Sequence, residues 1–234
     1  MSGTKIFEAS PEAKGKAKQL RLFAILAWVV AMVGQVFAIF RLISDETLVY
    51  LIIAIVVILA LAITGSTLWK KANRLDPASE ADTARFFIQN QLGAILGIMA
   101  FLPMVILIFT NKNISGKTKG IAGSIATVAM LAAGITGADF NPPSVEKYTE
   151  EINQQTAAAQ ELSIDSDNVY WSQAGNKYHA FDDCHHIAGK SLSNGSIKDS
   201  WEEKGISELC KTCQKRASKN RVTTDVKELI EVDN

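Results

Sequence analysis

Four metal-binding side chains near the C-terminus carry the chemistry of this chain. His179 and Cys184 are separated by four residues and Cys210 and Cys213 by two, with 25 residues between the two pairs. The sequence contains only these three cysteines. Thiolate sulfur and imidazole nitrogen are preferred ligands of Zn²⁺, and two close pairs joined by a loop are typical of a closed tetrahedral site. The spacing therefore predicts a structural Cys3His zinc site without an open position.

A β-hairpin is expected to present the histidine ligand. The runs Val169–Trp171 and Lys177–His179 are rich in residues that favour strands. Ala174-Gly175-Asn176 lies between them and is a turn signal. The two runs therefore predict a hairpin with His179 at the end of its second strand.

The cysteines are expected to lie on two short knuckles beside small helices. One knuckle brings in Cys184, while Cys210–Cys213 forms the other and leads into a helix from Gln214. Asp199–Lys204 predicts a short helix that ends at Gly205. A module of fewer than 60 residues buries little apolar surface and usually needs a staple, and zinc serves that purpose in a reducing compartment.

About 50 residues of this segment follow a known pattern, which is Val169-Tyr170-x4-Gly175-x2-Tyr178-His179-x4-Cys184, then Gly205 and Cys210-x2-Cys213. The pattern resembles the Ada-type zinc-binding module. The resemblance implies zinc binding by His179, Cys184, Cys210 and Cys213. In the DNA-repair protein that names the family, four cysteines bind zinc and one of them accepts a methyl group from DNA phosphates. Because the first ligand here is His179, and an imidazole cannot replace that thiolate, methyl transfer is not expected.

Four uncharged stretches dominate the first 140 residues. Asp, Glu, Lys, Arg and His are all missing from Leu22–Phe40, Leu48–Trp69, Phe86–Phe109 and Gly120–Ala138. A helix rises about 1.5 Å per residue and a bilayer core is about 30 Å thick, so each stretch is long enough to span it. Backbone groups in lipid must be satisfied internally, so each stretch should be helical. The chain is therefore expected to be an integral membrane protein.

The expected fold is an all-α membrane unit of four helices, followed by a small α+β zinc-binding module. The module should contain the β-hairpin, the two knuckles and short helices. Val145–Leu162 is expected to form a polar helix that serves as a stalk. The expected segments are a basic cytosolic tail, a four-span domain, a stalk with its linker, the zinc module and an acidic tail, at residues 1–21, 22–140, 141–167, 168–221 and 222–234.

The distribution of positive charge predicts the topology, because the net charge is zero and says nothing about partners. With the N-terminus inside, the N-terminal tail and the loop between the second and third stretches place nine basic residues on the inner side, whereas the other two loops place four on the outer side. Basic residues favour the cytoplasmic side of a membrane. We therefore expect a cell-membrane protein with both termini in the cytoplasm.

Small and polar residues within the four stretches predict how the helices pack. Pro103 should kink the third span. Small residues at a four-residue spacing let helices approach closely, either within one chain or in a homo-oligomer, and occur at Gly93-x3-Gly97, Gly120-x3-Ser124 and Ala122-x3-Ala126. Hydrogen bonds between helices are expected from Gln35, Gln89, Asn90 and Gln91. The lack of ionisable residues in the stretches argues against a pump.

Other interpretations of the site remain open. Cys210 and Cys213 would form a redox pair if the module faced outward. His185 or His186 can replace His179 as fourth ligand, although we expect both to be exposed. A catalytic zinc would need a general base, but the acidic residues near the ligands are expected to be solvated, and they are Asp182, Asp183 and Glu208.

A basic stretch follows the second knuckle and consists of Lys211, Lys215, Arg216, Lys219 and Arg221. It is either a solvated helix face or a surface for anionic lipid or nucleic-acid phosphates. A base-reading element is not evident, so sequence-specific binding of nucleic acid is not expected. The acidic tail from Asp225 to Asp233 is expected to shield this stretch or to be disordered.

These features favour a non-enzymatic interaction or regulatory protein with a zinc-binding head. Glycine-rich phosphate loops, Gly-x-Ser-x-Gly elbows and His-Glu-x2-His motifs do not occur, so no residue stands out as catalytic. The expected partners are the lipid bilayer, anionic lipid, and either another protein or a second copy of the chain. The alternatives are a small channel or transport-accessory subunit and a thiol redox protein that uses Cys210 and Cys213.

Overall fold

The computed structural model describes residues 6–232, with side chains described as far as residue 222. Lys5 of the expected basic tail and the side chains of the expected acidic tail from Asp225 to Asp233 lie outside this description. The elements are α1 (Pro11–Arg41), α2 (Leu48–Leu75), α3 (Thr83–Met99), α4 (Leu102–Thr110), α5 (Gly116–Gly137), α6 (Val145–Glu161), β1 (Val169–Ser172), β2 (Leu192–Gly195), α7 (Ile197–Lys204) and α8 (Lys211–Val232).

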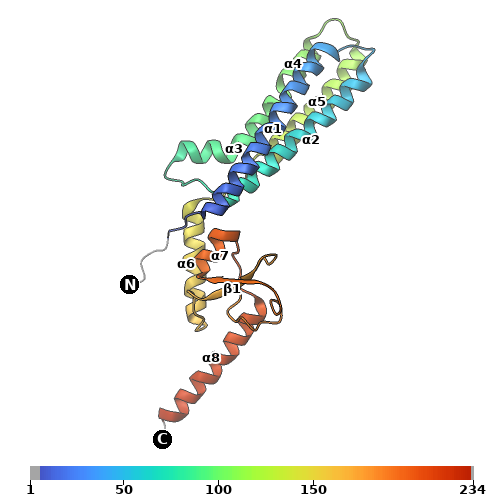
Figure 1. Cartoon of the computed structure of the whole chain (residues 1–234). Helices are drawn as coiled ribbons and strands as arrows, with labels where there is room; N and C mark the ends of the chain where they lie inside the picture. The colour runs from blue at the N-terminus through green and yellow to red at the C-terminus, as the bar shows by residue number, and fades with distance from the viewer. Residues whose placement is uncertain (1–5, 233–234) are drawn as a thin grey trace. The chain divides into compact units, whose positions relative to one another are not determined.

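Contacts divide the chain into two compact units (Figure 1). Gly15–Pro143 form one, which we call the membrane unit. Met1–Lys14 and Ser144–Asn234 together form the other, which we call the head unit. The described residues before Gly15, which include the first turn of α1, are therefore grouped with the C-terminal module.

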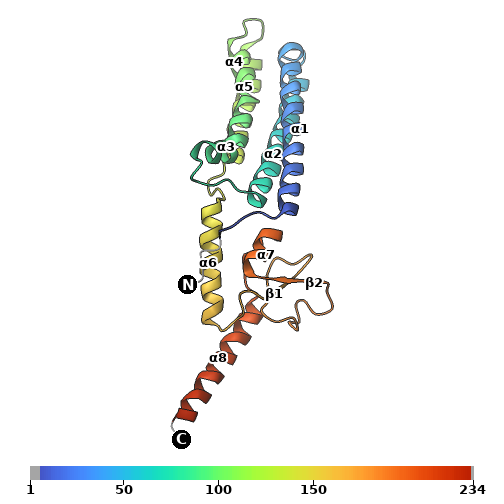
Figure 2. The same ribbon diagram turned by 60° about the vertical axis from the view of Figure 1, so that its left-hand side comes forward.

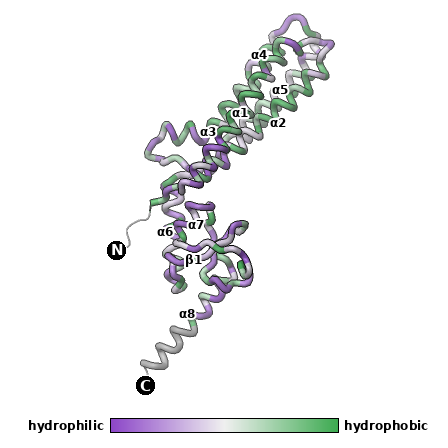
Figure 3. The backbone as a smooth tube through the Cα atoms, in the orientation of Figure 1, coloured by the Kyte–Doolittle hydropathy of each residue, from purple (hydrophilic) through white to green (hydrophobic). Residues whose placement is uncertain are grey.

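The four expected spans are present as helices long and apolar enough to cross a bilayer, at Pro11–Arg41, Leu48–Leu75, Thr83–Thr110 and Gly116–Gly137. Their apolar character runs along the membrane unit (Figure 3). Large apolar side chains such as Phe37, Val57 and Val128 are exposed on its outside. A soluble unit of this size would bury such residues, whereas lipid solvates them. This is the pattern of a membrane protein.

Pro103 breaks the third span, as the sequence predicts. α3 ends at Met99, and α4 begins at Leu102 with Pro103 in its first turn. A proline has no N–H to continue the preceding helix, but its fixed φ suits the start of a new one. The N–H of Phe101 donates to the carbonyl of Ile98 and closes the break with a tight turn.

Small residues bring α3 and α5 into backbone contact. A Cβ atom added at Gly137 would lie 2.4 Å from the backbone of Gly93, and one at Gly97 would lie 2.8 Å from the carbonyl oxygen of Ala133. Ala122 and Ala126 are also buried, whereas Gly120 and Ser124 are exposed. Of the three small-residue patterns in the sequence, two thus pack inside the chain and one stays on its surface.

Amides tie α2 to the start of α3. The Asn73 side chain, fully buried, donates to the carbonyl of Gln89 at 2.7 Å, and the Trp69 indole donates to the same carbonyl at 2.7 Å. The Gln89 side chain donates to the carbonyl of Asp76 at 3.0 Å, and the Gln91 side chain donates to that of Asp139 at 3.2 Å. The side-chain carbonyl oxygen of Asn90 also accepts from the Asn73 side chain at 3.4 Å, so the predicted bonds are found for Gln89, Asn90 and Gln91. The prediction fails for Gln35, whose buried amide nitrogen has no hydrogen-bond partner among the described residues.

The head unit has a core that begins before the first span. The Phe7 ring packs edge-on against Tyr148 of α6 with 5.1 Å between centroids, and Tyr148 packs against Trp201 of α7 at 5.0 Å. The N–H of Phe7 donates to the Thr149 hydroxyl at 2.9 Å. Ile152 of α6 is also fully buried in this cluster. The helix expected as a stalk thus forms one wall of the head.

The sheet of the head unit differs from the expected hairpin. β1 pairs along its length with β2, antiparallel, in the register Tyr170↔Asn194 (Figure 2). The expected partner segment pairs with β1 through the bridge Tyr170↔His179 alone, closed by backbone hydrogen bonds of 2.8 and 2.7 Å, and its Tyr178 forms a separate bridge with Leu209. The chain cannot continue as a strand beyond His179 because it must turn to bring Cys184 back beside that histidine.

The backbone contact between α3 and α5 predicts the effect of a single methyl group. We expect Gly137→Ala to lower the stability of the membrane unit by roughly 1–3 kcal/mol, because the overpacked methyl meets backbone that cannot yield. Gly120→Ala on the same helix is the control, because a Cβ there meets nothing within 4 Å. Unfolding in detergent micelles, followed by circular dichroism, measures both. Equal stabilities of the two variants would contradict this packing.

The aromatic cluster predicts that the N-terminal segment stabilises the head. Phe7 is 4% exposed, so Phe7→Ala should cost about 3 kcal/mol and make the head susceptible to protease. Ile6→Ala is the matched control, because Ile6 precedes Phe7 directly but is 65% exposed. Limited proteolysis of the full chain in micelles compares the two. A Phe7→Ala head as resistant as the Ile6→Ala head would show that the segment does not pack there.

Candidate metal centre

Backbone hydrogen bonds around Tyr178 draw the two ligand pairs together. The N–H of Tyr178 donates to the carbonyl of Glu208 at 3.0 Å, and the N–H of Cys210 donates to the carbonyl of Tyr178 at 2.8 Å. The Tyr178 side chain is 2% exposed and anchors this crossing in the core. Because His179 follows Tyr178 directly, the crossing places the histidine beside Cys210.

Local turns hold the other two cysteines. The carbonyl of Cys184 accepts hydrogen bonds from the N–H groups of Ile187 and Ala188 at 2.9 and 3.0 Å, which folds the chain into a tight knuckle. Cys213 lies in the first turn of α8. Its Sγ atom lies within 4.8 Å of the Sγ atom of Cys210. The second knuckle and the helix are continuous, since α8 begins at Lys211 and not at Gln214.

The structure brings the four predicted ligands into one cluster. Their donor atoms all lie within 4.8 Å of one another, and each residue is at most 5% exposed. The Sγ atom of Cys213 lies 3.7 Å from Nδ1 of His179. A tetrahedral zinc ion with ordinary bond lengths would hold sulfur and nitrogen about 3.6 Å apart. The group can therefore bind a metal ion, with Nδ1 as the nitrogen donor of His179.

Backbone N–H groups favour the thiolate form of Cys210, which is the form that binds a metal. Burial acts to raise the pKa of this thiol, but hydrogen bonds from the N–H groups of Cys213 and Thr212, joined by the neighbouring thiols, lower it below its usual value. Burial, followed by the hydrogen bond with Cys184, raises the pKa of the Cys213 thiol to about 12. Three thiols packed together cannot all ionise unless a cation joins them, which is the role of a bound metal.

The histidine of the cluster is held in its neutral form. Burial lowers the pKa of His179, and the positive charges of His186, Lys190 and His185 lower it further. A neutral imidazole has a free lone pair for a metal, whereas a protonated one does not. His186, Lys190 and His185 also place positive charge beside the centre. Three thiolates and a divalent ion would give that centre a net charge of minus one.

The two remaining histidines lie outside the cluster. His185 and His186 are exposed, as predicted, and their rings lie 3.9 Å apart. Nε2 of His186 lies 3.1 Å from the hydroxyl of Thr212. His179 is thus the histidine of the donor group that the described residues form.

The acidic residues near the ligands are engaged elsewhere. Asp183 forms an ion pair with Arg216 at 2.6 Å, and Arg216 also stacks over the Phe181 ring at 4.3 Å. Glu208 pairs with Lys177. Asp182 and Asp183 are exposed, as predicted. None of the three belongs to the donor group found among the described residues.

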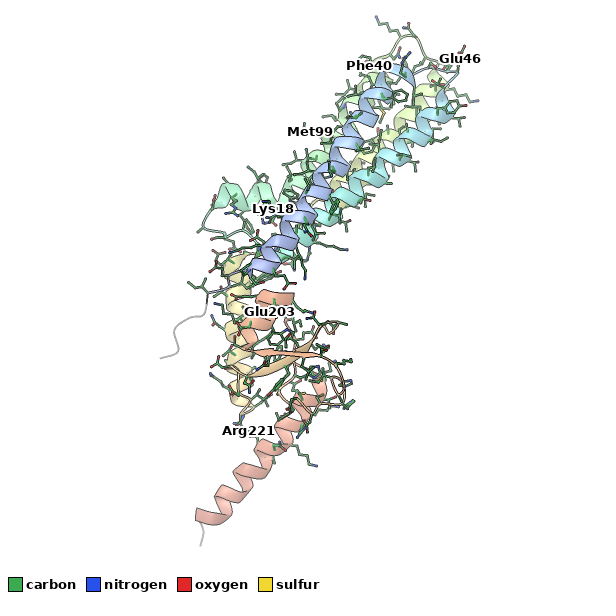
Figure 4. The ribbon with its side chains drawn as sticks, viewed as in Figure 1. Lys18, Phe40, Glu46, Met99, Glu203 and Arg221 are labelled. Atoms are coloured by element: carbon green, nitrogen blue, oxygen red, sulfur yellow. The ribbon has the colours of Figure 1, made fainter. Side chains whose placement is uncertain are left out.

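Two residues of the basic stretch also bind within the head. Besides the ion pair of Arg216, the guanidinium of Arg221 on α8 donates to the carbonyl of Glu161 at the end of α6 (Figure 4). These contacts hold the start of α8 against the module. Lys211 and Lys215 of the stretch are exposed and form no ion pair among the described residues. Beside the hydrogen bond from Lys177, however, the charge of Lys211 helps to lower the pKa of Glu208.

Comparison of the chain with family models, with curated proteins and with solved structures gives no match. The chemistry of the head therefore has to be derived from its own residues.

Two residues close to the centre were not found from the sequence. Ser172 and Lys190 line a cavity that also reaches His179 and Cys210. Ser172 ends β1, and Lys190 follows Gly189, whose φ of 72° marks a turn. The turn at Gly189 was a detectable signal for Lys190. The position of Ser172 depends on pairing with β2, which the sequence did not indicate.

The donor group predicts which histidine controls metal affinity. Removing one ligand of four should weaken binding of Co²⁺, used as a spectroscopic probe of tetrahedral sites, by more than about 100-fold in His179→Ala. His185→Ala should bind Co²⁺ like the parent, because this exposed ring is outside the group. Titration of the full chain, followed by Co²⁺ absorption, measures both. Loss of binding in His185→Ala with retention in His179→Ala would reverse the ligand assignment.

Proposed function

We propose that the metal is zinc and that its role is structural. Three sulfurs and one imidazole form the soft, four-donor set that zinc favours in closed sites. The burial of all four residues supports a closed site, although His179 and Cys210 also line a neighbouring cavity. The resemblance of the ligand spacing to the Ada-type module supports the same donor set. Zinc then acts as the staple of the head, whose apolar core is small.

We propose further that the chain is a membrane-anchored interaction or regulatory protein with no enzymatic activity. The buried, closed donor group carries this proposal, because a catalytic zinc needs an open position and a nearby base. Two of the acidic side chains near the centre are held in ion pairs, Asp183 with Arg216 and Glu208 with Lys177. The head then serves as a rigid, metal-supported surface held at the membrane by the four spans.

The proposed topology has both termini in the cytoplasm of a cell-membrane protein. The segment around Phe7 and the module after Ser144 share one core, which supports their being on the same side of the bilayer. Four spans between them give the same result. The excess of basic residues on that side favours the cytoplasm, where a reducing environment keeps cysteines available for zinc.

The proposed partners follow from the exposed surfaces. Lipid covers the outside of the membrane unit, and anionic lipid is suited to Lys211 and Lys215. The exposed face of α5 at Gly120 and Ser124 suits close contact with a helix of another protein or of a second copy.

Metal content tests the structural centre. Full-length protein purified in detergent under reducing conditions should contain one equivalent of zinc by mass spectrometry, and Cys210→Ser should lose it. His186→Gln should keep it, because this exposed histidine lies outside the donor group. An iron-loaded protein would overturn the choice of zinc. A metal-free protein with a Cys210–Cys213 disulfide would instead support the redox alternative.

Crosslinking in native membranes tests the interaction role. A photo-reactive residue at the exposed position Gln173 of the head should give a discrete crosslinked product that mass spectrometry can identify. The product should disappear in Cys210→Ser, because the head loses its metal, and persist in His186→Gln. A product that is unchanged in Cys210→Ser would contradict a metal-supported interaction surface.

A further inference from the structure

A cavity opens directly beside the metal centre in the head unit. Its volume is about 380 Å³, and its wall includes the ligands His179 and Cys210. Ligand sites for small molecules commonly occupy about 300–1,000 Å³. The cavity is thus large enough for a small metabolite and extends well beyond the position of a metal ion.

The cavity is lined by positive charge. Lys177, Lys190 and Lys211 contribute to its wall, and none of its lining residues is acidic. Lys177 is neutralised by Glu208 from outside the wall. The ammonium group of Lys190 donates one hydrogen bond to the carbonyl of His186 at 2.8 Å and has two further protons to donate.

Beside the hydrogen bond from Lys177, the charge of the third lysine, Lys211, also acts on Glu208 and helps to lower the pKa of that carboxyl. Lys211 is exposed and makes no ion pair with any residue whose side chain the structure describes. The charges of Lys190 and Lys211 therefore remain after Lys177 is paired, and they exceed the single negative charge of a Cys3His centre with a divalent ion. A concave site with a surplus of cations attracts an anion.

The Ser172 hydroxyl adds a hydrogen-bonding group to the wall of the cavity. Ser172 is 3% exposed and lines the cavity, yet its hydroxyl makes no hydrogen bond to any residue that the structure describes. A Cβ at Gly175, which also lines the cavity, would lie 2.8 Å from Oγ of Ser172. Any larger residue at 175 would close off the hydroxyl. The hydroxyl is not among the fully buried side-chain atoms that lack a partner, so it is accessible from the cavity and can hydrogen-bond to a bound group.

A second hydroxyl and an imidazole complete the polar lining. The Thr212 hydroxyl and Nε2 of His186 lie 3.1 Å apart in the wall. Two ammonium groups and two hydroxyls on the wall of one cavity match a group with several acceptor oxygens and more than one negative charge. A phosphate monoester has both properties, whereas a carboxylate has one charge and two oxygens.

We propose that this cavity binds the phosphate group of a small phosphorylated molecule, with Ser172, Lys190 and Lys211 as its principal contacts. The proposal rests on the proposed metal-supported head, because His179 and Cys210 form part of the wall. Binding would connect ligand occupancy to the surface that the head presents. A free phosphate ester and the phosphomonoester headgroup of a lipid share this chemistry.

Calorimetric titration tests the site with glycerol 3-phosphate as the probe. Full-length protein in phosphatidylcholine nanodiscs should bind one equivalent. Lys190→Gln and Lys211→Gln should each weaken binding about tenfold or more, because each removes a charged hydrogen-bond donor. Lys215→Gln is the matched control, since it removes the same charge from the same helix outside the cavity lining. It should bind like the parent.

Ser172→Ala provides an independent variant, because alanine fits the buried position and removes only the hydroxyl. It should weaken binding by several-fold while the protein keeps its zinc. Nanodiscs that contain phosphatidic acid separate the two sources of phosphate. If the natural ligand is the lipid headgroup, the heat of glycerol 3-phosphate binding should disappear in discs that contain phosphatidic acid. If the natural ligand is a soluble ester, the heat should be the same in both kinds of disc.

Zinc content, measured on the same samples, separates this inference from the proposed function. Zinc-loaded protein that gives no heat with glycerol 3-phosphate would overturn the phosphate site and leave the structural centre intact. Equal weakening in Lys215→Gln and Lys211→Gln would likewise overturn it, since the attraction would then be diffuse. Absence of zinc from the parent protein would overturn the proposed function itself.

Discussion

Four donor atoms within 4.8 Å of one another impose the path of the chain through the head unit. The bridge at His179, the knuckle at Cys184 and the first turn of α8 must all place their donor atoms at the same site. Each of these placements interrupts regular structure, which explains why the sheet consists of a short pair of strands and isolated bridges. A metal ion can bind all four donors at once, and in the structural role that we propose it would replace the cohesion of a larger core.

The rest of the head is arranged to support that point. Tyr178 anchors the crossing between the two ligand pairs, and the aromatic series from Phe7 through Tyr148 to Trp201 extends the core away from the metal. The segment before the first span contributes to this series. The head is therefore built from both ends of the chain. The membrane unit obeys a different constraint, since lipid provides no hydrophobic drive between helices and contact depends on glycines and amides.

The local features could be predicted from the sequence. Absence of charge located the four spans, Pro103 located the break in the third, and ligand spacing located the donor group. α7 begins at Ile197, two residues before its expected start, although the capping box of Ser196 and Asp199 was a readable signal for the earlier start. Features that depend on distant pairing could not be predicted. Phe7 and Thr149 are 142 residues apart, and the Leu-Ser-Asn-Gly sequence of β2 has little intrinsic preference for a strand.

The central claim is that one zinc ion joins His179, Cys184, Cys210 and Cys213. X-ray absorption spectroscopy at the zinc edge of the full-length protein tests it most directly, because the shell of scattering atoms reports the donors themselves. The account predicts three sulfur atoms at about 2.3 Å and one nitrogen at about 2.0–2.1 Å. A shell with two sulfurs, or one completed by oxygen from water or a carboxylate, would contradict a closed Cys3His centre.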